Sequence, residues 1–306
     1  MNEPPELGEK IQLPNEIKEA GQNNNLVLFI GAGISKLLDL PLWKEFASEV
    51  LEDLRKKDCL DYSDIDQLTR YLNPKQILSI ADSISEAKEV KLELEKHFKE
   101  NTELTNIYEA INSIACVYVT TNYDGLLGHE NLPEADKRVY GRESIRPELL
   151  SKQGTAIHLH GYKGDPETMV VTTKDYLEHY DAENIQNFLK QLFQKKTVVF
   201  LGYSLEETEI LEHIFRRGKT RKIEELKHVE LKHFIVTGFF RSQSRLYEKL
   251  YMYYRETFGV KLLGFTRDRE DHKGIESIIK DWAYRIKDER IEHEEIEFIE
   301  EVLGDG

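Results

Sequence analysis

The amino-acid sequence predicts an α/β fold built on a doubly wound parallel sheet. Short and almost wholly apolar runs, such as Leu26–Ile30 and Thr197–Leu201, alternate with longer stretches of helical periodicity. Strands that are apolar along their whole length are typical of parallel sheets covered by helices on both faces. Glycines and polar residues follow several of these runs, and such sheets bind ligands at the carboxyl ends of their strands. We therefore expect one shared site at these ends.

The composition indicates a folded protein and argues against several functional classes. The chain has 306 residues, 40% of them hydrophobic, which suits one large domain or one domain with an insertion. Its formal net charge of −15, without a large basic stripe, disfavours direct contact with nucleic acid. The apolar runs are far shorter than the roughly 20 residues that cross a bilayer, and the first residues lack a signal-peptide pattern. We expect a soluble, cytoplasmic protein that does not bind membranes.

The two cysteines, Cys59 and Cys116, fit a reducing compartment. They form no Cys-x-x-Cys pair, which excludes a cysteine zinc ribbon within the chain. His158 and His160 have a spacing that a metal site can use, but the sequence offers no third ligand nearby. We therefore expect no bound metal.

A helical insertion is expected between the first two strands. Residues 1–25 read as a leader with a short helix, and Leu26–Ile30 is the first strand. A helix is expected to start at Pro41, and its Trp43 is interpreted as a packing residue. Only helical patterns follow as far as Ser113, which defines an insertion of about residues 50–113. Its later helices are expected from Asn73-Pro74 onward, through Val90–Phe98, and through Leu104–Ile114.

Strands and helices alternate after the insertion, so residues 26–285 form one domain. The expected strands are Ala115–Thr121, Thr155–Leu159, Met169–Val171, Thr197–Leu201, His233–Gly238 and Gly259–Gly264. The expected helices are at Thr173–Lys195, from Leu205 to about Phe215, and at Ser242–Thr257, with a charged connector at residues 219–230.

Residues 286–306 are expected to form an acidic helical tail. Ile291, Ile296, Ile299 and Leu303 are spaced as one apolar stripe among acidic residues. A solvated helix docked on its own domain explains this pattern. An assembly surface for a homo-oligomer or a partner explains it equally well.

The first strand ends in Gly31-Ala32-Gly33-Ile34-Ser35, a pattern found in nucleotide-binding loops. Glycines let the backbone turn tightly and approach a ligand, and free N–H groups at the start of a helix face an anion. The third glycine of the full dinucleotide fingerprint is missing, and many buried strands end at glycine. A phosphate loop and a purely structural turn both fit this stretch alone.

Asn122 and Asp124 directly follow the second strand. Asn and Asp are common at strand ends and helix caps, so ordinary turn chemistry explains them. Beside the glycosidic carbon of a nucleotide, Asn122 could instead hold a ribose hydroxyl or position a water. Asp124 could bind the same sugar, or cap the helix and stabilise the site.

His160 and Gly202 follow at the ends of two later strands. His158 and His160 alternate and so are expected on one face, and either could be a satisfied core histidine. His160 is the better catalytic candidate, because Gly161 leaves space for a ligand and a neutral imidazole can accept a proton from a ribose hydroxyl or a water. Gly202 would allow close backbone approach, and Ser204 could cap a helix or hold a phosphate or ribose oxygen.

Taken in order, these strand ends resemble the motifs of the sirtuin family. The matching segments are Gly31–Ser35, Thr120–Asp124, Leu159–Gly161 and Gly202–Leu205, and the resemblance spans roughly residues 26–265. It implies a Rossmann-like sheet that binds NAD, with Asn122 and His160 as catalytic residues. It also implies an NAD-binding set in which the glycine loop holds the pyrophosphate and the last motif lines the adenosine half: Gly31, Ala32, Gly33, Ser35, Asp124, Gly202 and Ser204.

The sequence departs from the protein-deacylating sirtuins in two places. Those proteins continue the first motif with Gly-Ile-Pro-Asp-Phe-Arg, where this chain has Leu40-Pro-Leu-Trp-Lys44. They carry a four-cysteine zinc module after the His-Gly motif, whereas this chain has no cysteine beyond residue 116. The chain looks more like the sirtuin-like domains of bacterial antiviral systems, which hydrolyse NAD to nicotinamide and ADP-ribose and so starve an infected cell.

This resemblance implies an NAD glycohydrolase that acts in abortive infection. It would work as a homo-oligomer or with a second component, such as a HerA-type ATPase or a phage-protein sensor. A sirtuin-type deacylase or ADP-ribosyltransferase is an alternative, although both departures argue against it. A non-catalytic module that reads a nucleotide is another. NAD and NADP are both open as the nucleotide.

Overall fold

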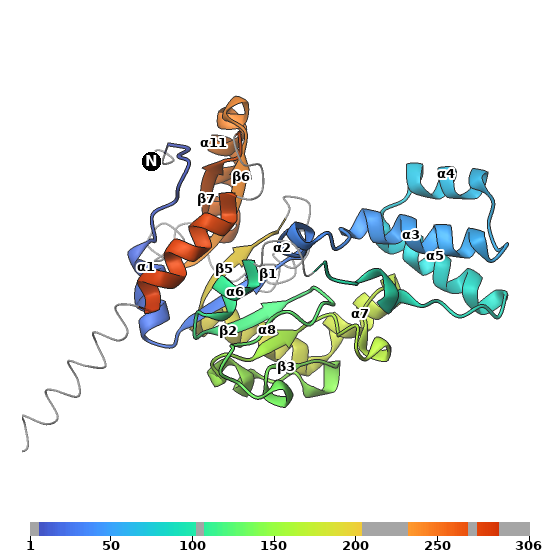
Figure 1. Cartoon of the computed structure of the whole chain (residues 1–306), viewed down its shortest axis with the longest axis horizontal. Coiled ribbons are helices and arrows are strands. Elements are labelled where there is room, and N and C mark those ends of the chain that lie inside the picture. The colour runs from blue at the N-terminus through green and yellow to red at the C-terminus, as the bar shows by residue number, and fades with distance from the viewer. Residues whose placement is uncertain (1–5, 102–106, 204–231, 269–273, 288–306) are drawn as a thin grey trace, which may run out of the picture.

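The chain forms a parallel sheet, as predicted, and the sheet has seven strands (Figure 1). We describe it from a computed structural model over residues 6–101, 107–203, 232–268 and 274–287. The strand order is β3-β4-β2-β1-β5-β6-β7, and every neighbouring pair is parallel. The chain builds β2 to β4 on one side of β1 and β5 to β7 on the other. The order therefore reverses between β1 and β5, which is where doubly wound sheets bind ligands.

Helices connect most of these strands. The strands are β1 (Leu26–Ile30), β2 (Val117–Thr120), β3 (Arg138–Val139), β4 (Ala156–His158), β5 (Thr197–Leu201), β6 (His233–Phe239) and β7 (Val260–Thr266). The α-helices are α1 (Asn15–Gln22), α2 (Ala32–Ser35), α3 (Trp43–Lys56), α4 (Tyr62–Tyr71), α5 (Pro74–Ala87), α6 (Ile107–Asn112), α7 (Thr173–Asp181), α8 (Glu183–Lys195) and α11 (Ser244–Tyr253), with a further helix at residues 274–287. Short 3₁₀ turns are η1 (Lys36–Leu38), η2 (Leu94–His97), η3 (Glu134–Asp136), η4 (Arg142–Ser144), η5 (Pro147–Ser151), η6 (Pro166–Thr168) and η7 (Arg241–Gln243), and η8 (Tyr254–Phe258) is a π-helical turn.

The central strand β1 is buried on both faces. Leu26, Leu28 and Ile30 belong to one hydrophobic cluster, and Val27 and Phe29 belong to another. Side chains of a strand point to opposite faces with a period of two, so β1 contributes to both layers of the core. The neighbouring strands β2 and β5 alternate in the same way. The prediction of apolar strands covered on both sides is confirmed.

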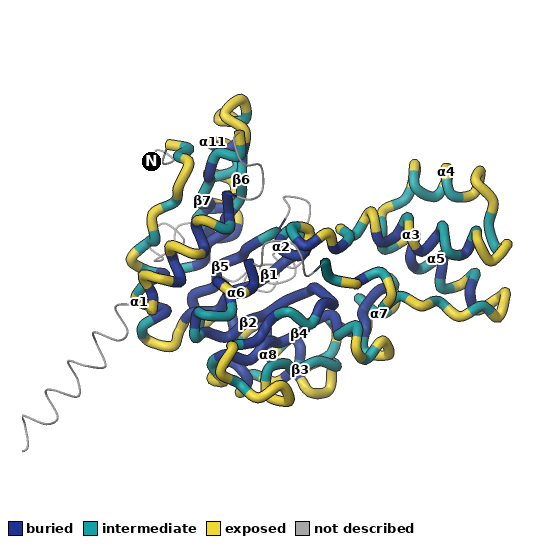
Figure 2. The backbone as a smooth tube through the Cα atoms, in the orientation of Figure 1, coloured by how far each residue is buried: buried dark blue, intermediate teal, exposed yellow. Residues whose placement is uncertain are grey.

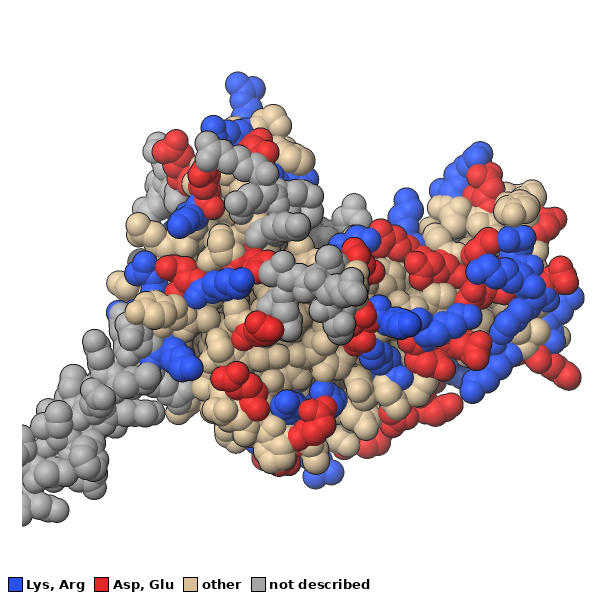
Figure 3. All heavy atoms as spheres, in the orientation of Figure 1, with Lys and Arg blue, Asp and Glu red and all other residues tan. Residues whose placement is uncertain are grey.

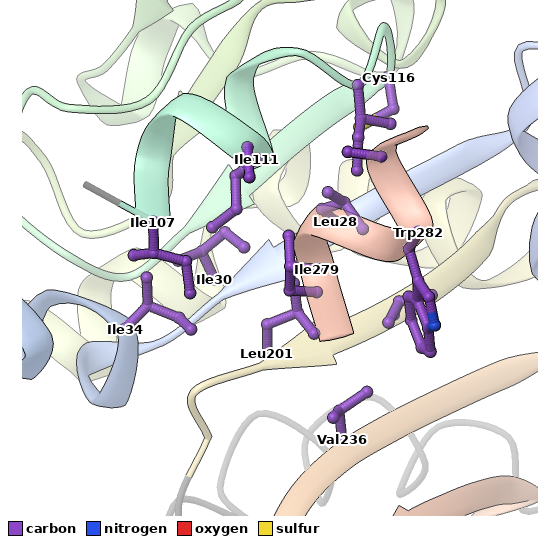
Figure 4. Packing of buried hydrophobic residues seen from close by; sticks show 14 of the residues in the cluster. Leu28, Ile30, Ile34, Ile107, Ile111, Cys116, Leu201, Val236, Ile279 and Trp282 are labelled. Carbon is purple, nitrogen blue, oxygen red and sulfur yellow. The ribbon is translucent and has the colours of Figure 1, made fainter. Parts of the chain in front are cut away.

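α6 and the helix at residues 274–287 cover one face of the sheet (Figure 4), and α1 adds Ile17 and Ala20 to the same hydrophobic cluster. Ile279 and Trp282 bring the C-terminal helix onto the strands, and Ile107 brings α6 beside it. The indole N–H of Trp282 donates to the carbonyl oxygen of Ile11, which satisfies the polar atom of this buried side chain. The segment before α1 is thereby fixed to the same layer.

α8 and α11 cover the opposite face. Phe188 of α8 and Tyr247 of α11 are buried there, together with the inward side chains of the strands. Phe29 of β1 and Phe200 of β5 stack with their ring centroids 5.0 Å apart. This aromatic pair packs on the face covered by α8 and α11 and joins β1 to β5, the two strands between which the strand order reverses.

α3, α4 and α5 form a helical module beside the sheet, with a hydrophobic cluster of its own (Figure 1, Figure 2). Tyr123, Met169 and Val171 complete this cluster from segments that follow the strands, so the module borders the carboxyl edge of the sheet. α6, which we expected in the insertion, packs on the sheet instead. Acidic and basic side chains are interspersed over the module in the view of Figure 3.

Two predicted elements are wrong. Met169–Val171 forms no strand; the N–H of Val170 donates instead to the carbonyl oxygen of His160, which holds the segment against the site rather than in the sheet. The helix expected through Val90–Phe98 is reduced to the short turn η2. Glu89 takes a left-handed conformation with φ of 52°, which ends the preceding helix and redirects the chain.

The other boundaries hold to within a few residues. The helix expected from Pro41 begins at Trp43, because the side chain of Glu45 accepts a hydrogen bond from the N–H of Leu42 and closes the first turn. β3 was not expected, since two residues are too few to show a period in the sequence.

Some predictions fall on segments outside the described residues. These are the helix to about Phe215, the connector at residues 219–230, and the tail beyond residue 287. In the described part of the chain, every helix is too short or too polar to span a membrane.

Candidate active site

The segments that follow β1, β2, β4 and β5 meet at one edge of the sheet. The first glycine turn contacts Gly202 after β5, and the side chain of Asn122 after β2 reaches the carbonyl oxygen of Gly31. His158 at the end of β4 contacts the carbonyl oxygen of Asn122. The structure therefore brings the segments after these four strands close together, and Gly31, Gly33, Asn122 and Gly202 of the predicted residues are in direct contact there. Ser204 lies outside the described residues.

The two glycine turns pack directly on each other. The N–H of Gly33 donates to the carbonyl oxygen of Gly202 at 2.8 Å, and the N–H of Gly31 donates to Leu201 at 2.8 Å. A methyl group on Gly33 would lie 2.7 Å from the Gly202 oxygen, and one on Gly202, whose φ is 71°, would lie 2.5 Å from the nitrogen of Ile34. Neither methyl fits. The contact between the two turns is therefore sufficient to require glycine at both positions, whether or not the turns bind a ligand.

A buried hydrogen-bond network joins Ser35, Asn122 and Asp124. The Nδ2 atom of Asn122 donates to the carbonyl oxygen of Gly31 at 3.1 Å and to Ser35 Oγ at 2.7 Å. Ser35 Oγ donates to Asp124 Oδ2 at 2.8 Å, and Asp124 Oδ1 accepts from the N–H of Leu126 at 3.2 Å. A carbonyl oxygen can only accept, so the atom that faces Gly31 is the amide nitrogen of Asn122. The amide oxygen of Asn122 is left for another partner.

Burial and hydrogen bonding act in opposite directions on Asp124. Burial raises the pKa of its carboxyl group above the usual value, while the hydrogen bonds from Ser35 and the Leu126 N–H lower it. Among charged side chains, Glu100 raises this pKa and Lys163 lowers it. Buried carboxyl groups with a perturbed pKa are typical of functional sites, although structural networks also produce them.

A small, partly open cavity lies beside this network. Its polar side comes from the first glycine turn and the loop after β2, and its apolar side comes from the helical module. Trp43 lines the cavity and also packs against its neighbours. Its ring centroid is 6.2 Å from that of Phe46 and 6.0 Å from that of Tyr123. The lining combines aromatic rings with polar side chains, as the linings of small-molecule sites commonly do. The lining residues are Ala32, Ser35, Leu40, Pro41, Trp43, Phe46, Phe98, Thr121, Asn122, Tyr123 and Asp124.

His160 is buried and does not line the cavity; its ring lies between two tyrosines of α7, and one of these, Tyr176, has its ring centroid 6.1 Å from that of Trp43 in the lining. Its Nε2 atom is 2.8 Å from the hydroxyl of Tyr180, and its Nδ1 atom is 3.4 Å from the hydroxyl of Tyr176. Burial is the main cause that holds the pKa of His160 well below its usual 6.5. The ring is therefore neutral at pH 7 and able to accept a proton.

His158 has different surroundings from His160, because β4 ends at His158 and the strand alternation stops there. Its Nδ1 atom lies 3.1 Å from the carbonyl oxygen of Asn122 and so carries the hydrogen. Burial lowers the pKa of His158 to about 4, which keeps the ring neutral while it fixes the loop after β2. Among the described residues, no group of three or more His, Cys, Asp or Glu side chains could hold a metal ion.

Three residues of the site are not among the predicted site residues: Tyr108, which lies outside the motif segments, and Thr121 and Tyr203, which lie within them. The Thr121 Oγ1 atom lies 3.0 Å from the Tyr203 hydroxyl, which ties the loops after β2 and β5 together. The Tyr108 hydroxyl lies 2.9 Å from Ser35 Oγ. A tyrosine at a buried helical position, such as Tyr108, is a weak indication of a polar contact, because its hydroxyl needs a hydrogen-bond partner.

Comparisons with known proteins agree with this geometry. Residues 116–258 match the family model of the SIR2-like domain, and this span includes the segments after β2, β4 and β5. SIR2-like domains use NAD as their substrate. Over 215 residues the chain is 28% identical to Defense-associated sirtuin 2 of Bacillus subtilis, which covers 65% of this chain and 20% of that protein. The chain thus spans about a fifth of the length of this curated relative. On these grounds residues 116–258 are similar to the SIR2-like domain, and the chain is similar to a defence-associated sirtuin.

Proposed function

We propose that this protein is an NAD glycohydrolase, which cleaves the bond between nicotinamide and ribose and releases nicotinamide and ADP-ribose. The observation that carries the proposal is the cavity, where an aromatic wall faces the buried network of Ser35, Asn122 and Asp124 beside the glycine turns. The SIR2-like span of residues 116–258 supports NAD as the substrate.

The cavity has the chemistry that the nicotinamide end of NAD requires. The nicotinamide ring of NAD is flat, aromatic and positively charged, and Trp43, Phe46 and Phe98 offer aromatic rings that can pack against it and attract its charge. Its carboxamide both donates and accepts hydrogen bonds, which suits the polar side of the cavity. The glycine turns would then lie along the pyrophosphate and the adenosine half.

Hydrolysis breaks the bond between ribose C1′ and the ring nitrogen. The bonding electrons leave with the nitrogen, so the cationic pyridinium becomes neutral nicotinamide and no general acid is needed. A water oxygen then bonds to C1′ and the water loses one proton. The amide oxygen of Asn122 would orient this water or a ribose hydroxyl. His160 is the proposed final acceptor of the proton, which would reach its ring through an intervening group such as a ribose hydroxyl.

Two features favour water over an acyl-lysine as the acceptor. No cysteine follows Cys116, so the zinc module that deacylating sirtuins carry after the His-Gly motif is missing. The helical module also supplies Leu40, Pro41 and Trp43 to the cavity wall, at the place where the sequence departs from the deacylases.

We further propose that NAD cleavage serves antiviral defence by depleting NAD in an infected cell. The support is the likeness to a relative whose name describes it as defence-associated. Because the chain spans about a fifth of that relative, its assembly is also a proposal. It would act in the cytoplasm as a homo-oligomer, or with a component such as a HerA-type ATPase or a phage-protein sensor.

An NAD-loss assay tests the function, with and without the proteins encoded beside this one. Asn122→Ala should lower cleavage by about 100-fold or more, because both the oriented oxygen and the link to Ser35 are lost. Asn184→Ala is the matched control. The Nδ2 atom of Asn184 also donates two hydrogen bonds, to the carbonyl oxygens of Arg142 and Ile145, but Asn184 does not line the cavity.

Three results would contradict the proposal in different ways. Full activity of a folded Asn122→Ala variant would remove Asn122 from the mechanism. NAD consumption that strictly requires an acyl-lysine peptide would indicate a deacylase or transferase. Binding of NAD without turnover, even with partner proteins present, would indicate a nucleotide-sensing module.

A further inference from the structure

Tyr108 brings a hydroxyl group into the site from outside the SIR2-like span. It lies on α6 and is 1% exposed, with its hydroxyl 2.9 Å from Ser35 Oγ and 3.3 Å from Asp124 Oδ2. Its ring packs in the apolar layer on the sheet, where a phenylalanine would fill the same volume. A buried hydroxyl costs free energy unless it is hydrogen-bonded. The oxygen is therefore explained by its hydrogen bonds in the site, which also involve Asn122, and not by the packing.

The hydrogens of this network run in one direction, toward Asp124. Asn122 donates to Ser35, and Ser35 gives its single hydroxyl hydrogen to Asp124. Ser35 thus has no hydrogen left for Tyr108, so Tyr108 must donate, either to Ser35 or to Asp124. A hydrogen bond from Tyr108 to Asp124 Oδ2 adds a donor to the carboxylate and supports its ionised form, whereas a hydrogen bond from Tyr108 to Ser35 supports it only through Ser35.

The same order fixes the amide of Asn122. Both hydrogens of its Nδ2 atom are in use, so its oxygen is the group available to a ligand in the cavity. If Asp124 were protonated, it would donate to Ser35, and the Ser35 hydrogen would need another acceptor. Tyr108 can supply that acceptor and phenylalanine cannot. Without Tyr108 the Ser35 hydrogen would turn toward the amide nitrogen of Asn122, which does not accept hydrogen bonds.

We propose that Tyr108 is a positioning residue for NAD cleavage: through Ser35 and Asp124, it keeps the amide oxygen of Asn122 directed at the reacting end of the nucleotide. This inference rests on the proposed function. Tyr108 does not touch the reacting atoms and acts only through the other three side chains.

The test compares Tyr108→Phe with the matched control Tyr118→Phe. Tyr118 is equally buried in the same apolar layer, but its hydroxyl donates to the backbone carbonyl oxygens of Ile111 and Ile114 and not to the site. A hydrogen bond to a charged group is worth enough that its loss should lower kcat about tenfold to a hundredfold in Tyr108→Phe, with KM little changed. Protonation of Asp124 should add to the acid limb that His160 sets in the kcat profile, and this contribution should move to higher pH in Tyr108→Phe, because Asp124 loses a donor. Tyr118→Phe should lower only the melting temperature.

A double variant supplies an independent check. Ser35→Ala removes the next hydroxyl of the same hydrogen-bond network. Tyr108→Phe combined with Ser35→Ala should therefore cleave NAD no more slowly than Ser35→Ala alone. Additive losses would overturn the inference, and so would a kcat and an acid limb that match between Tyr108→Phe and Tyr118→Phe. Ser35→Ala also serves as the variant with which to test the acid limb if Tyr108→Phe does not fold.

Failure of the inference can be told from failure of the proposed function. If the wild type does not cleave NAD, the proposed function is wrong, and calorimetric titration with NAD decides the inference. Weaker NAD binding by Tyr108→Phe than by Tyr118→Phe supports a positioning role for Tyr108. Equal affinities overturn it, and a wild type that neither cleaves nor binds NAD overturns both proposals.

Discussion

The amide nitrogen of Gly33 donates a hydrogen bond to the carbonyl oxygen of Gly202, and the two atoms are 2.8 Å apart. This bond joins the turn after β1 to the turn after β5, the two strands between which the strand order reverses. In doubly wound sheets the ligand crevice lies at this point. The two turns therefore behave as one unit, and the position of each depends on the other.

Gly33→Ala should destabilise the protein and weaken its binding of NAD together. The added methyl group would lie 2.7 Å from the carbonyl oxygen of Gly202, a backbone atom that cannot retreat without displacing the turn after β5. Overpacking of this kind costs about 1–3 kcal/mol of folding free energy. Thermal unfolding and calorimetric titration with NAD measure the two effects. A melting temperature and an NAD affinity like those of the wild type would show that the turns do not depend on each other.

Asp124→Asn should leave stability close to that of the wild type but lower NAD cleavage. Burial raises the pKa of Asp124, so ionising its carboxyl group costs folding free energy above that pKa, and asparagine removes this cost. Asparagine also places an NH₂ donor against the Ser35 hydroxyl or the Leu126 N–H, which costs about 1–3 kcal/mol. The two effects oppose each other in stability, but only the second disturbs the site.

Thermal unfolding and kcat of Asp124→Asn separate these roles. An unchanged kcat would mean that Asp124 only caps the turn after β2, the structural alternative that its place in the sequence also allows. A large loss of stability with an unchanged kcat would contradict the expectation that the removed ionisation cost offsets the mispaired NH₂ group.

The sheet could be predicted because its strands carry their own pattern. Leu26–Ile30 is apolar at every position and ends at glycine, which identifies a strand covered on both faces without knowledge of its neighbours. Residues 169–171 show the limit of that pattern. They are apolar as well, but they are held by His160 and by Tyr123, whose hydroxyl donates to the carbonyl oxygen of Val170. Tertiary contacts determine the conformation of residues 169–171, and the hydrophobic pattern of the sequence does not reveal such contacts.

The site could be predicted only as far as its residues directly follow strands. Asn122 and Gly202 do so, and parallel topology brings them to one edge. Tyr108 and Tyr180 lie on helices, and each is placed by a hydroxyl that meets a residue far away in the sequence. Helical periodicity identifies such a tyrosine as buried but does not say what its oxygen contacts.

The free energy of unfolding should fall as the pH is lowered from 7 to 5, in part because of His233. Its Nδ1 atom accepts from the N–H of Val198 at 3.3 Å and its Nε2 atom donates to the carbonyl oxygen of Phe193 at 3.1 Å, so the neutral ring satisfies both nitrogens. Burial lowers the pKa of His233 to about 4, against about 6.5 in the unfolded chain. Such a group contributes stability in full above pH 6.5, and this contribution is lost as the pH falls toward 4.

Urea unfolding of the wild type and of His233→Gln at pH 7 and pH 5 checks this contribution. Glutamine does not titrate, so the variant should lose about 2 kcal/mol less than the wild type between the two pH values. His158 and His179, whose pKa values burial also lowers to about 4, are present in both proteins and do not affect the difference. An equal fall in both proteins would show that His233 is not held neutral by the fold.

NAD cleavage should stay almost constant from pH 8 down to about pH 6, because His160 remains neutral over that range. Burial, followed by His179 and Lys75, holds the pKa of His160 well below 6.5, so its ring loses the ability to accept a proton only at lower pH. Lys75→Gln removes one positive charge and should move the acid limb to slightly higher pH, since burial remains the larger cause. The kcat profiles of both proteins measure this. A wild-type limb centred near pH 6.5 would mean that the working imidazole is solvated, and that Tyr176 and Tyr180 do not enclose it during catalysis.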